Sequence, residues 1–225
     1  MNRKSLVIFF SLSLLGPTVG NAQEPSNPPT PPFMVVPTDA TWTMTVNAPN
    51  GAGTSGGVQL RERQVAQKGP IRQEINLWSD GSKTETWIID KIRLIGLPSN
   101  RGIHVLDPMR DPVGAADAAR DEFLSIQWLG LNAYVGPESY QGHLCYHFRL
   151  HPTPANATGT TGKEAGETWI DTVTKLMVAY NDGTNLYTFV FGPPPASLVP
   201  PTPFTLLLKK YEQDTNPLNI PMPPH

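Results

Sequence analysis

Five side chains that can carry charge or bind a metal alternate along one short stretch of the chain. They are His143, Cys145, His147, Arg149 and His151. In an extended strand, alternate residues lie roughly 6.6 Å apart on one face, so two histidines at this spacing can converge on one ion. Imidazole and thiolate groups suit zinc or copper. The stretch therefore makes His143, Cys145 and His147 a candidate metal site.

A structural role explains the same row of residues without a metal. The row alternates with Leu144, Tyr146, Phe148 and Leu150, so it is equally the water-facing side of a strand whose apolar side is buried. A metal site needs further ligands from an adjacent strand, and the sequence contains no other segment rich in histidine or cysteine. We therefore expect no bound cofactor.

Other residues that could support catalysis have simpler explanations. Asp90 and Asp171 each follow a Trp-Ile stretch; paired carboxylates can do acid–base chemistry, but strand ends and turns explain them as well. Nothing near Cys145 supplies the partner that a catalytic cysteine needs. The glycine-rich stretch Asn50–Gly57 lacks the strand-to-helix context of a phosphate-binding loop. We expect a protein that is not an enzyme.

Period-two alternation predicts the strands that would position these residues. In Thr41–Asn47, Trp42, Met44 and Val46 face one way and the polar residues face the other, which is typical of a half-buried strand. The same reasoning predicts strands at Val58–Gln67, Ile71–Ser79, Thr84–Leu94, Gly102–Leu106, Leu144–Leu150, Glu167–Asp171, Lys175–Tyr180, Leu186–Phe191 and Phe204–Tyr211. Hairpin turns at Asp80–Gly81 and Asn181–Gly183 then predict an antiparallel meander.

One helix is expected to interrupt these strands. Asp111 and Pro112 supply an N-cap and a proline at the first helical position, the alanine-rich stretch Val113–Gln127 follows, and Gly130 provides a stop. The buried stripe of this helix is predicted to contain Ala116, Ala119, Phe123 and Ile126. The predicted fold is mainly β with one or two helices (α+β), a large antiparallel sheet with a helix packed against it.

The two ends of the chain differ from its centre. Residues 1–22 have the parts of a cleavable signal peptide: basic Arg3 and Lys4, the apolar run Leu6–Leu15, and small residues up to Ala22. The run is shorter than the about 20 residues that a membrane span needs. A proline-rich leader follows over residues 23–38, a β domain over 39–214, and a proline-rich tail over 215–225. We expect a periplasmic or secreted protein with no membrane span after cleavage.

Net charge and cysteine content limit the kinds of partner and the sources of stability that we expect. Residues 1–22 contain two of the 17 basic residues and no acidic one, which leaves 15 against 19 and a net charge of −4. No basic patch stands out, so nucleic acid is not an expected partner. With Cys145 alone, no intramolecular disulfide is possible, and stability must come from apolar burial.

Several short motifs resemble those of the LolA-like superfamily, the periplasmic carriers of outer-membrane lipoproteins and their distant members. WTMT begins at Trp42 and ETWIID at Glu85; ETWID begins at Glu167 and is followed by TKL at Thr174. YQG at Tyr140 leads into Cys145 and Tyr146 in a similar way. The resemblance covers roughly residues 39–213. It implies a strongly curved sheet, a half-barrel, whose apolar concave face is partly covered by a helix and can hold acyl chains.

Eight residues are candidates for such an apolar face. They are Trp42, Met44, Val46, Ile75, Leu77, Trp87, Ile89 and Leu144. The simpler alternative is that they form a dry core beneath the helix. The sequence therefore predicts a noncatalytic exported binding protein with a lipid or another apolar ligand. The alternative is a module with a filled core and no small ligand, which recognises a protein of the cell envelope.

Overall fold

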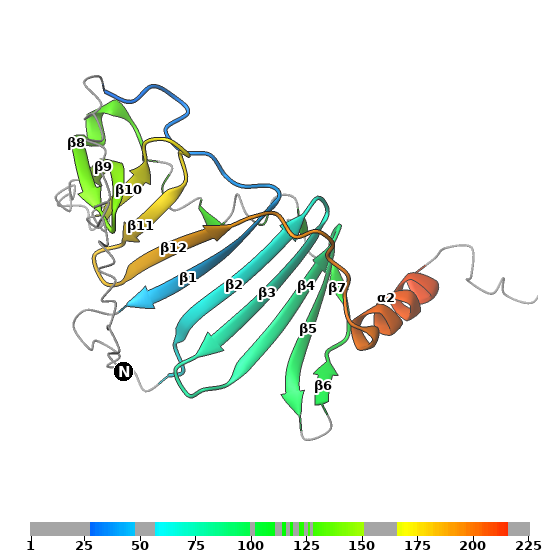
Figure 1. Ribbon diagram of the computed structural model, residues 1–225. Helices are drawn as coiled ribbons and strands as arrows, with labels where there is room; N and C mark the ends of the chain where they lie inside the picture. Colours follow the sequence, from blue (N-terminus) through cyan, green and yellow to red (C-terminus); the bar gives the residue numbers. More distant parts are fainter. Residues whose placement is uncertain are drawn as a thin grey trace, which may run out of the picture.

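A computed structural model of the 225-residue chain describes residues 28–47, 57–99, 102–110, 114–115, 118, 122–123, 126, 128–150 and 166–215. The expected signal peptide, glycine-rich loop, His151 and nearly all of the proline-rich tail lie outside these ranges. In the described residues, twelve strands form one antiparallel sheet (Figure 1). The fold class predicted from the sequence is confirmed.

The sheet consists of two meanders, and the first strand of one pairs with the last strand of the other. The first contains β1 (Ala40–Asn47), β2 (Leu60–Lys68), β3 (Ile71–Trp78), β4 (Lys83–Ile89), β5 (Ile92–Ser99) and β6 (Gly102–Val105), with β7 (Met109–Arg110) also paired to β5. The second contains β8 (Tyr134–Tyr140), β9 (His143–Leu150), β10 (Gly166–Asp171), β11 (Met177–Asn181) and β12 (Leu186–Gly192). β1 pairs with β12, so β6 and β8 lie at opposite edges.

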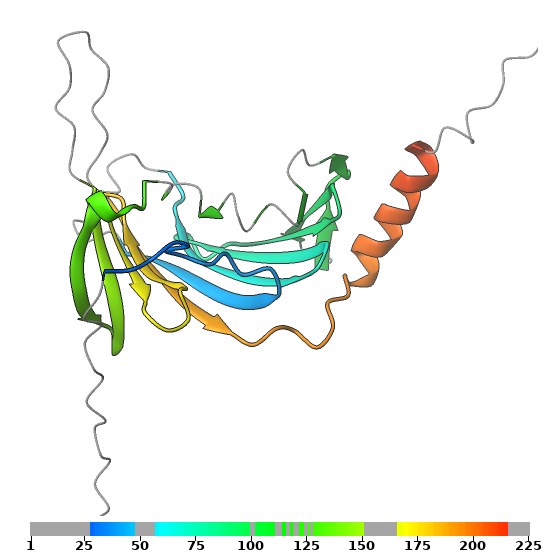
Figure 2. The same ribbon diagram turned by 90° about the horizontal axis from the view of Figure 1, so that it is seen from above.

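The sheet is curved into a trough (Figure 2). The described residues between β7 and β8 lie on its concave side, whereas α2 (Thr202–Thr215) and the segment that leads to it lie on the convex side. Because directly paired residues of antiparallel strands share a face, the pairing registers assign each side chain to one side. Trp42 pairs with Val65 and with Phe191, and all three belong to the concave side.

The predicted strand Thr84–Leu94 is in fact two strands. β4 ends at Ile89 and β5 begins at Ile92. Asp90 between them has a φ of 52°, the left-handed conformation that aspartate tolerates better than most residues, and it reverses the chain. The apolar run masked this turn because no glycine or proline marks it.

The prediction of a strand at Phe204–Tyr211 is wrong, because these residues belong to α2. Phe204, Leu207, Leu208 and Tyr211 have the spacing of one helical face. Phe204 is fully buried, with its ring 6.1 Å from that of Trp87. A Cβ at Gly96 of β5 would lie 2.7 Å from the Phe204 ring, so the glycine lets the helix approach the sheet.

The helix expected at Val113–Gln127 falls largely outside the described residues, as do Ala116 and Ala119 of its predicted stripe. Gly114, Ala115, Ala118 and Glu122 are helical in conformation. Phe123 and Ile126, the other two stripe residues, are buried against the concave face. Gly130 precedes a short 3₁₀ helix, η2 (Leu131–Ala133), which leads into β8.

Candidate functional site

One half of the concave face carries aromatic side chains. We call Trp42, Phe123, Phe148 and Phe189 the aromatic region; β1, β9 and β12 supply three of them, and Phe123 lies over the sheet. The Phe123 ring lies 6.3 Å from that of Trp42 and 5.5 Å from that of Phe189. All four are at most 8% exposed. Phe123 therefore fills space on this face that the strands leave open.

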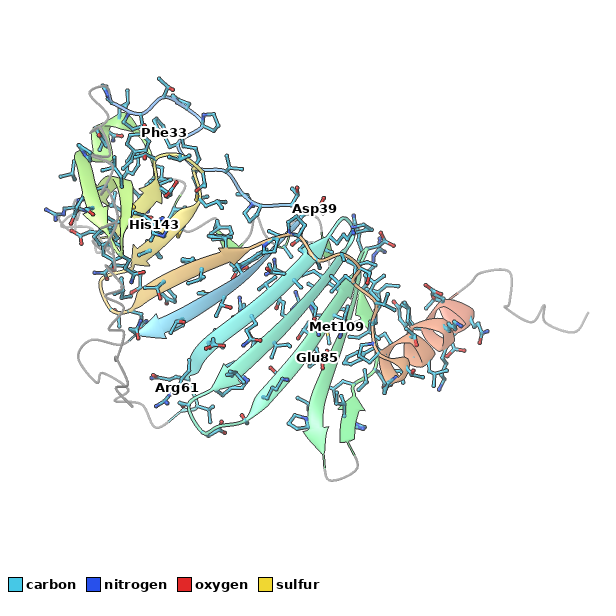
Figure 3. The ribbon with its side chains drawn as sticks, viewed as in Figure 1. Phe33, Asp39, Arg61, Glu85, Met109 and His143 are labelled. Atoms are coloured by element: carbon cyan, nitrogen blue, oxygen red, sulfur yellow. The ribbon has the colours of Figure 1, made fainter. Side chains whose placement is uncertain are left out.

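The described part of the leader closes one end of the aromatic region. The ring of Phe33 lies 5.7 Å from that of Phe148 (Figure 3). Met34 and Val36 also pack against this cluster, and the Val35 amide donates to the carbonyl of Lys175 over 2.9 Å. Phe33, Met34 and Val36 are thus partly buried against the core.

The other half of the concave face is polar. We call Arg72, Glu74, Glu122 and Gln67 the ion-pair region. The guanidinium of Arg72 donates to Glu74 over 2.6 Å, to Gln67 over 3.1 Å and to Glu122 over 2.6 Å. Arg63 lies beside it, donates to Asn76 over 2.8 Å and approaches Glu122 to 3.7 Å. A charged residue that is 1% exposed is thus paired with two carboxylates.

The two halves meet at Trp42. The guanidinium carbon of Arg72 lies 4.9 Å from the centre of the Trp42 ring, which places the cation over an aromatic face. Two buried atoms at this junction have no hydrogen-bond partner, Trp42 Nε1 and Glu122 Oε1. Buried polar atoms are rarely left unpaired, so the junction has unused donor and acceptor capacity.

Sequence reasoning missed the ion-pair region. In β3 it aligned Ile71, Ile75 and Leu77 on one side, and the pairing register agrees, since Ile71 and Ile75 pair opposite Ile89 and Glu85 on the convex side. The polar residues between them, Arg72 and Glu74, are buried in the trough. Alternation in polarity along a strand does not show whether its polar side is exposed or covered, so the pattern of β3 does not reveal the burial.

The predicted apolar candidates are divided between the two faces. Trp42, Met44, Val46 and Leu144 lie on the concave side, together with the aromatic region. Ile75, Leu77, Trp87 and Ile89 lie on the convex side, where Trp87 packs under α2. The eight residues therefore do not form one surface, and only the first four can contribute to a concave site.

The described residues of the β9 row share one face, as predicted, and this is the convex face, but it is not water-facing throughout. Cys145 and His147 are buried, whereas His143 and Arg149 are exposed. The His147 ring stacks on Trp169 at 4.9 Å, and Trp169 stacks on Tyr140 at 4.5 Å. We call Tyr140, Cys145, His147 and Trp169 the histidine cluster.

Carboxylates surround the histidine cluster. His147 Nδ1 lies 2.9 Å from Glu138 Oε2, which also accepts from Trp169 Nε1 over 3.1 Å. His147 Nε2 has no hydrogen-bond partner and lies 3.9 Å from Glu167. Burial lowers the pKa of His147, because it disfavours the charged imidazolium. The negative charges of Glu138 and Glu167 act in the opposite direction and only partly offset this shift.

The remaining members of the predicted metal site are held by other contacts. His143 Nδ1 lies 3.0 Å from Asp171 Oδ2. Burial, aided by the charge of Asp171, raises the pKa of the Cys145 thiol to about 11, so thiolate is scarce near neutral pH. In the part of the chain that the structure describes, no three His, Cys, Asp or Glu side chains come together to hold a metal ion.

An open pocket of about 370 Å³ lies over β1, β2, β3 and β12. Thr43, Gln64 and Gln73 from the convex side are among its lining residues. Gln73 donates to Glu85 over 2.8 Å. Most of its lining side chains come from the convex face, opposite the aromatic region, and Trp42 is the lining residue that belongs to both.

The comparisons with known proteins found similarity to solved structures. No family model matches the chain, and no curated protein matches it. Among solved structures, the lipoprotein LppX of Mycobacterium tuberculosis matches with a TM-score of 0.41 and 10% sequence identity, over 72% of this chain and 88% of LppX. Within the described residues, no helix is long and apolar enough to cross a membrane.

Proposed function

We propose that this protein is a noncatalytic binding protein that carries a lipid or another apolar ligand on the aromatic region of its concave face. The observation that carries the proposal is how this face is covered. Its apolar side chains come from strands of both meanders, yet in the described residues they are covered by short segments and by no second sheet. A sheet face of this kind needs an apolar cover, and an acyl chain can supply part of it.

Phe123 and Ile126 mark the space that such a ligand would take. Both side chains are buried, at 4% and 2% exposure, and both come from outside the strands. Each methylene group transferred from water to this face stabilises the complex by about 0.8 kcal/mol. An acyl chain that displaces these two side chains can therefore compensate for the contacts that are lost.

The proposal includes export and the lack of catalysis. The signal-peptide pattern of residues 1–22 supports a periplasmic or secreted location. The high pKa of the Cys145 thiol argues against its use as a nucleophile. The concave face therefore favours binding of an apolar ligand rather than a chemical reaction.

The direct test is mass spectrometry of lipid extracts from protein purified without detergent, followed by titration of the delipidated protein with a fluorescent fatty acid. Val46→Trp adds bulk at a half-buried position of the concave face and should weaken binding by about tenfold, which corresponds to 1.4 kcal/mol. Val190→Trp, on the exposed convex side of the neighbouring strand, should leave binding unchanged.

Thermal unfolding of both variants must first show that each is folded. No co-purifying lipid, no binding of the fluorescent fatty acid and capture of an envelope protein instead would overturn the proposal. That outcome would favour an interaction module with a filled core, for which the packing of Phe123 between Trp42 and Phe189 is the supporting observation.

A further inference from the structure

Glu122 occupies an arginine site that the sheet itself builds. Arg63 of β2 and Arg72 of β3 project from the strands into the trough, and Glu122 reaches them from outside the sheet. Its Oε2 accepts from Arg72 over 2.6 Å, and its Oε1 lies 3.7 Å from Arg63. Its side chain is 6% exposed. A carboxylate is therefore bound here by two guanidinium groups away from water.

The carboxylate does not satisfy the site. Glu122 Oε1 has no hydrogen-bond partner, because 3.7 Å from Arg63 is too long for one. The buried Nε1 of Trp42, whose ring lies beneath Arg72, has none either. An unused donor and an unused acceptor next to two arginines indicate a site that can hold a different anion with more acceptor oxygens.

The charges of the region require an anion in this position. Among the described ion pairs of this region, Arg63 and Arg72 face Glu74 and Glu122, so two positive charges are balanced by two negative charges. Moving Glu122 away without a replacement leaves the two guanidinium groups of Arg63 and Arg72 with Glu74 as their single carboxylate. An uncompensated charge in a poorly solvated place is strongly unfavourable, so Glu122 leaves most readily in exchange for another anion.

We propose that the ligand is an anionic amphiphile whose carboxylate or phosphate binds Arg72 and Arg63 in place of Glu122. Its apolar chain then lies along the aromatic region, because Trp42 belongs to both regions and brings headgroup and chain sites together. This inference rests on the proposed function and adds the chemistry of the headgroup. Planar arginine groups bind carboxylates and phosphates with paired hydrogen bonds, which suits both headgroups.

The test compares two probes that differ only in charge, cis-parinaric acid and its methyl ester, by fluorescence titration of the delipidated full chain at pH 8. The acid should bind at least about tenfold more tightly than the ester, as expected for charge-assisted hydrogen bonds. Sodium phosphate alone, added as a competitor, distinguishes a headgroup held by its chain from a site for free phosphate. Competition only at high concentration is expected.

Three variants test which residues cause the preference for the acid over the ester. Arg63→Gln, at a half-buried position, should reduce the ratio of ester to acid dissociation constants to about one third or less. Arg61→Gln removes the same charge from an exposed position at the start of β2, two residues before Arg63, and should leave the ratio unchanged (Figure 3). Glu122→Gln should tighten binding of both probes, because the internal competitor is weakened while its shape is kept.

The outcomes separate this inference from the proposed function. Equal binding of the acid and the ester would overturn the headgroup assignment and leave an apolar carrier. Binding of neither probe, by protein whose thermal unfolding is intact, would overturn both. A preference for the acid that persists in Arg63→Gln and in the more buried Arg72→Gln, if both are folded, would place the anion elsewhere and also overturn the inference.

Discussion

The protein buries polar groups in two places that differ in how their charges are satisfied. In the ion-pair region, on the concave face, Arg72 is fully buried and is hydrogen-bonded to two carboxylates and one amide. In the histidine cluster, on the convex face, His147 is buried by stacking on Trp169 and keeps one nitrogen without a hydrogen-bond partner. The ion-pair region is stable because its charges balance, whereas the histidine cluster is stable because His147 stays uncharged.

This difference indicates what each cluster contributes. A buried pair of fixed charges contributes little net stability, but losing one partner is strongly destabilising. The buried arginine of the ion-pair region therefore favours arrangements in which a carboxylate from the covering segment lies over the sheet. Here that carboxylate belongs to Glu122. A buried imidazole responds instead to protons, because charging it without a full set of partners is unfavourable. The histidine cluster therefore makes stability depend on pH.

The largest effect is expected from Arg72→Met. The substitution leaves Glu74 and Glu122 without their main partner and should lower the free energy of unfolding by about 3–5 kcal/mol. Urea denaturation measures it, and Arg61→Met at an exposed position of the neighbouring strand β2 is the matched control, with a change within about 0.5 kcal/mol.

A variant in which apolar residues replace all four members of the ion-pair region tests the same interpretation. Replacing Arg72 by Met together with Gln67, Glu74 and Glu122 by Leu removes the four members of the ion-pair region and leaves Arg63, which is partly exposed and donates to Asn76. Stability should return to within about 1 kcal/mol of the original protein, because no buried charge is left unpaired. If the single Arg72 variant were as stable as the original, the carboxylates would have to be hydrated, and the ion-pair region would not be a closed network.

A smaller effect, confined to mildly acidic pH, is expected from His147. Burial lowers its folded-state pKa below the ordinary value of 6.5, so the unfolded chain binds the proton first. The stabilising contribution of the neutral ring is complete above pH 6.5 and is lost as the pH falls through the folded-state pKa. The free energy of unfolding should therefore decrease over this range.

His147→Gln should flatten that part of the pH profile, measured by urea denaturation at successive pH values. His104→Gln, at an exposed position of β6, should leave the profile unchanged. An unaltered slope in the His147 variant would show that other groups carry the pH dependence.

The smallest effect concerns reactivity rather than stability. Because the pKa of Cys145 is raised to about 11 and its side chain is buried, iodoacetamide at pH 8 should modify the folded protein at a small fraction of the rate for the unfolded chain. Intact-protein mass spectrometry follows the reaction. Equally fast modification of the folded protein would mean that the stacked rings open readily.

Strand patterns that depend on local contacts were predictable. The alternation of Trp42, Met44 and Val46 identified β1, and the Asp80–Gly81 turn identified the hairpin of β3 and β4, where Gly81 has a φ of 81°. β8 was not predicted, because Gly136 and Pro137 interrupt its pattern. The structure accommodates them with a bulge at an edge of the sheet, where a missing amide donor is tolerated.

Stretches compatible with two structures needed the tertiary context. Phe204–Tyr211 contains apolar residues that suit either a strand or one face of a helix, and packing of Phe204 against Trp87 goes with the helix. In the histidine row, the sequence placed His143, Cys145 and His147 on one face correctly. It did not show that Tyr140 and Trp169 from the neighbouring strands cover that face.

By itself, the sequence determined an antiparallel β protein whose strands have two chemically different faces, because side-chain alternation follows from backbone geometry within each strand. Only the tertiary structure decided what covers each face. The burial of Arg72 with Glu122 depends on residues 50 positions apart, and the division of the eight apolar candidates depends on the pairing registers between strands. Contacts between distant segments leave no periodic signal along the chain, so the polar half of the trough became visible only in the folded protein.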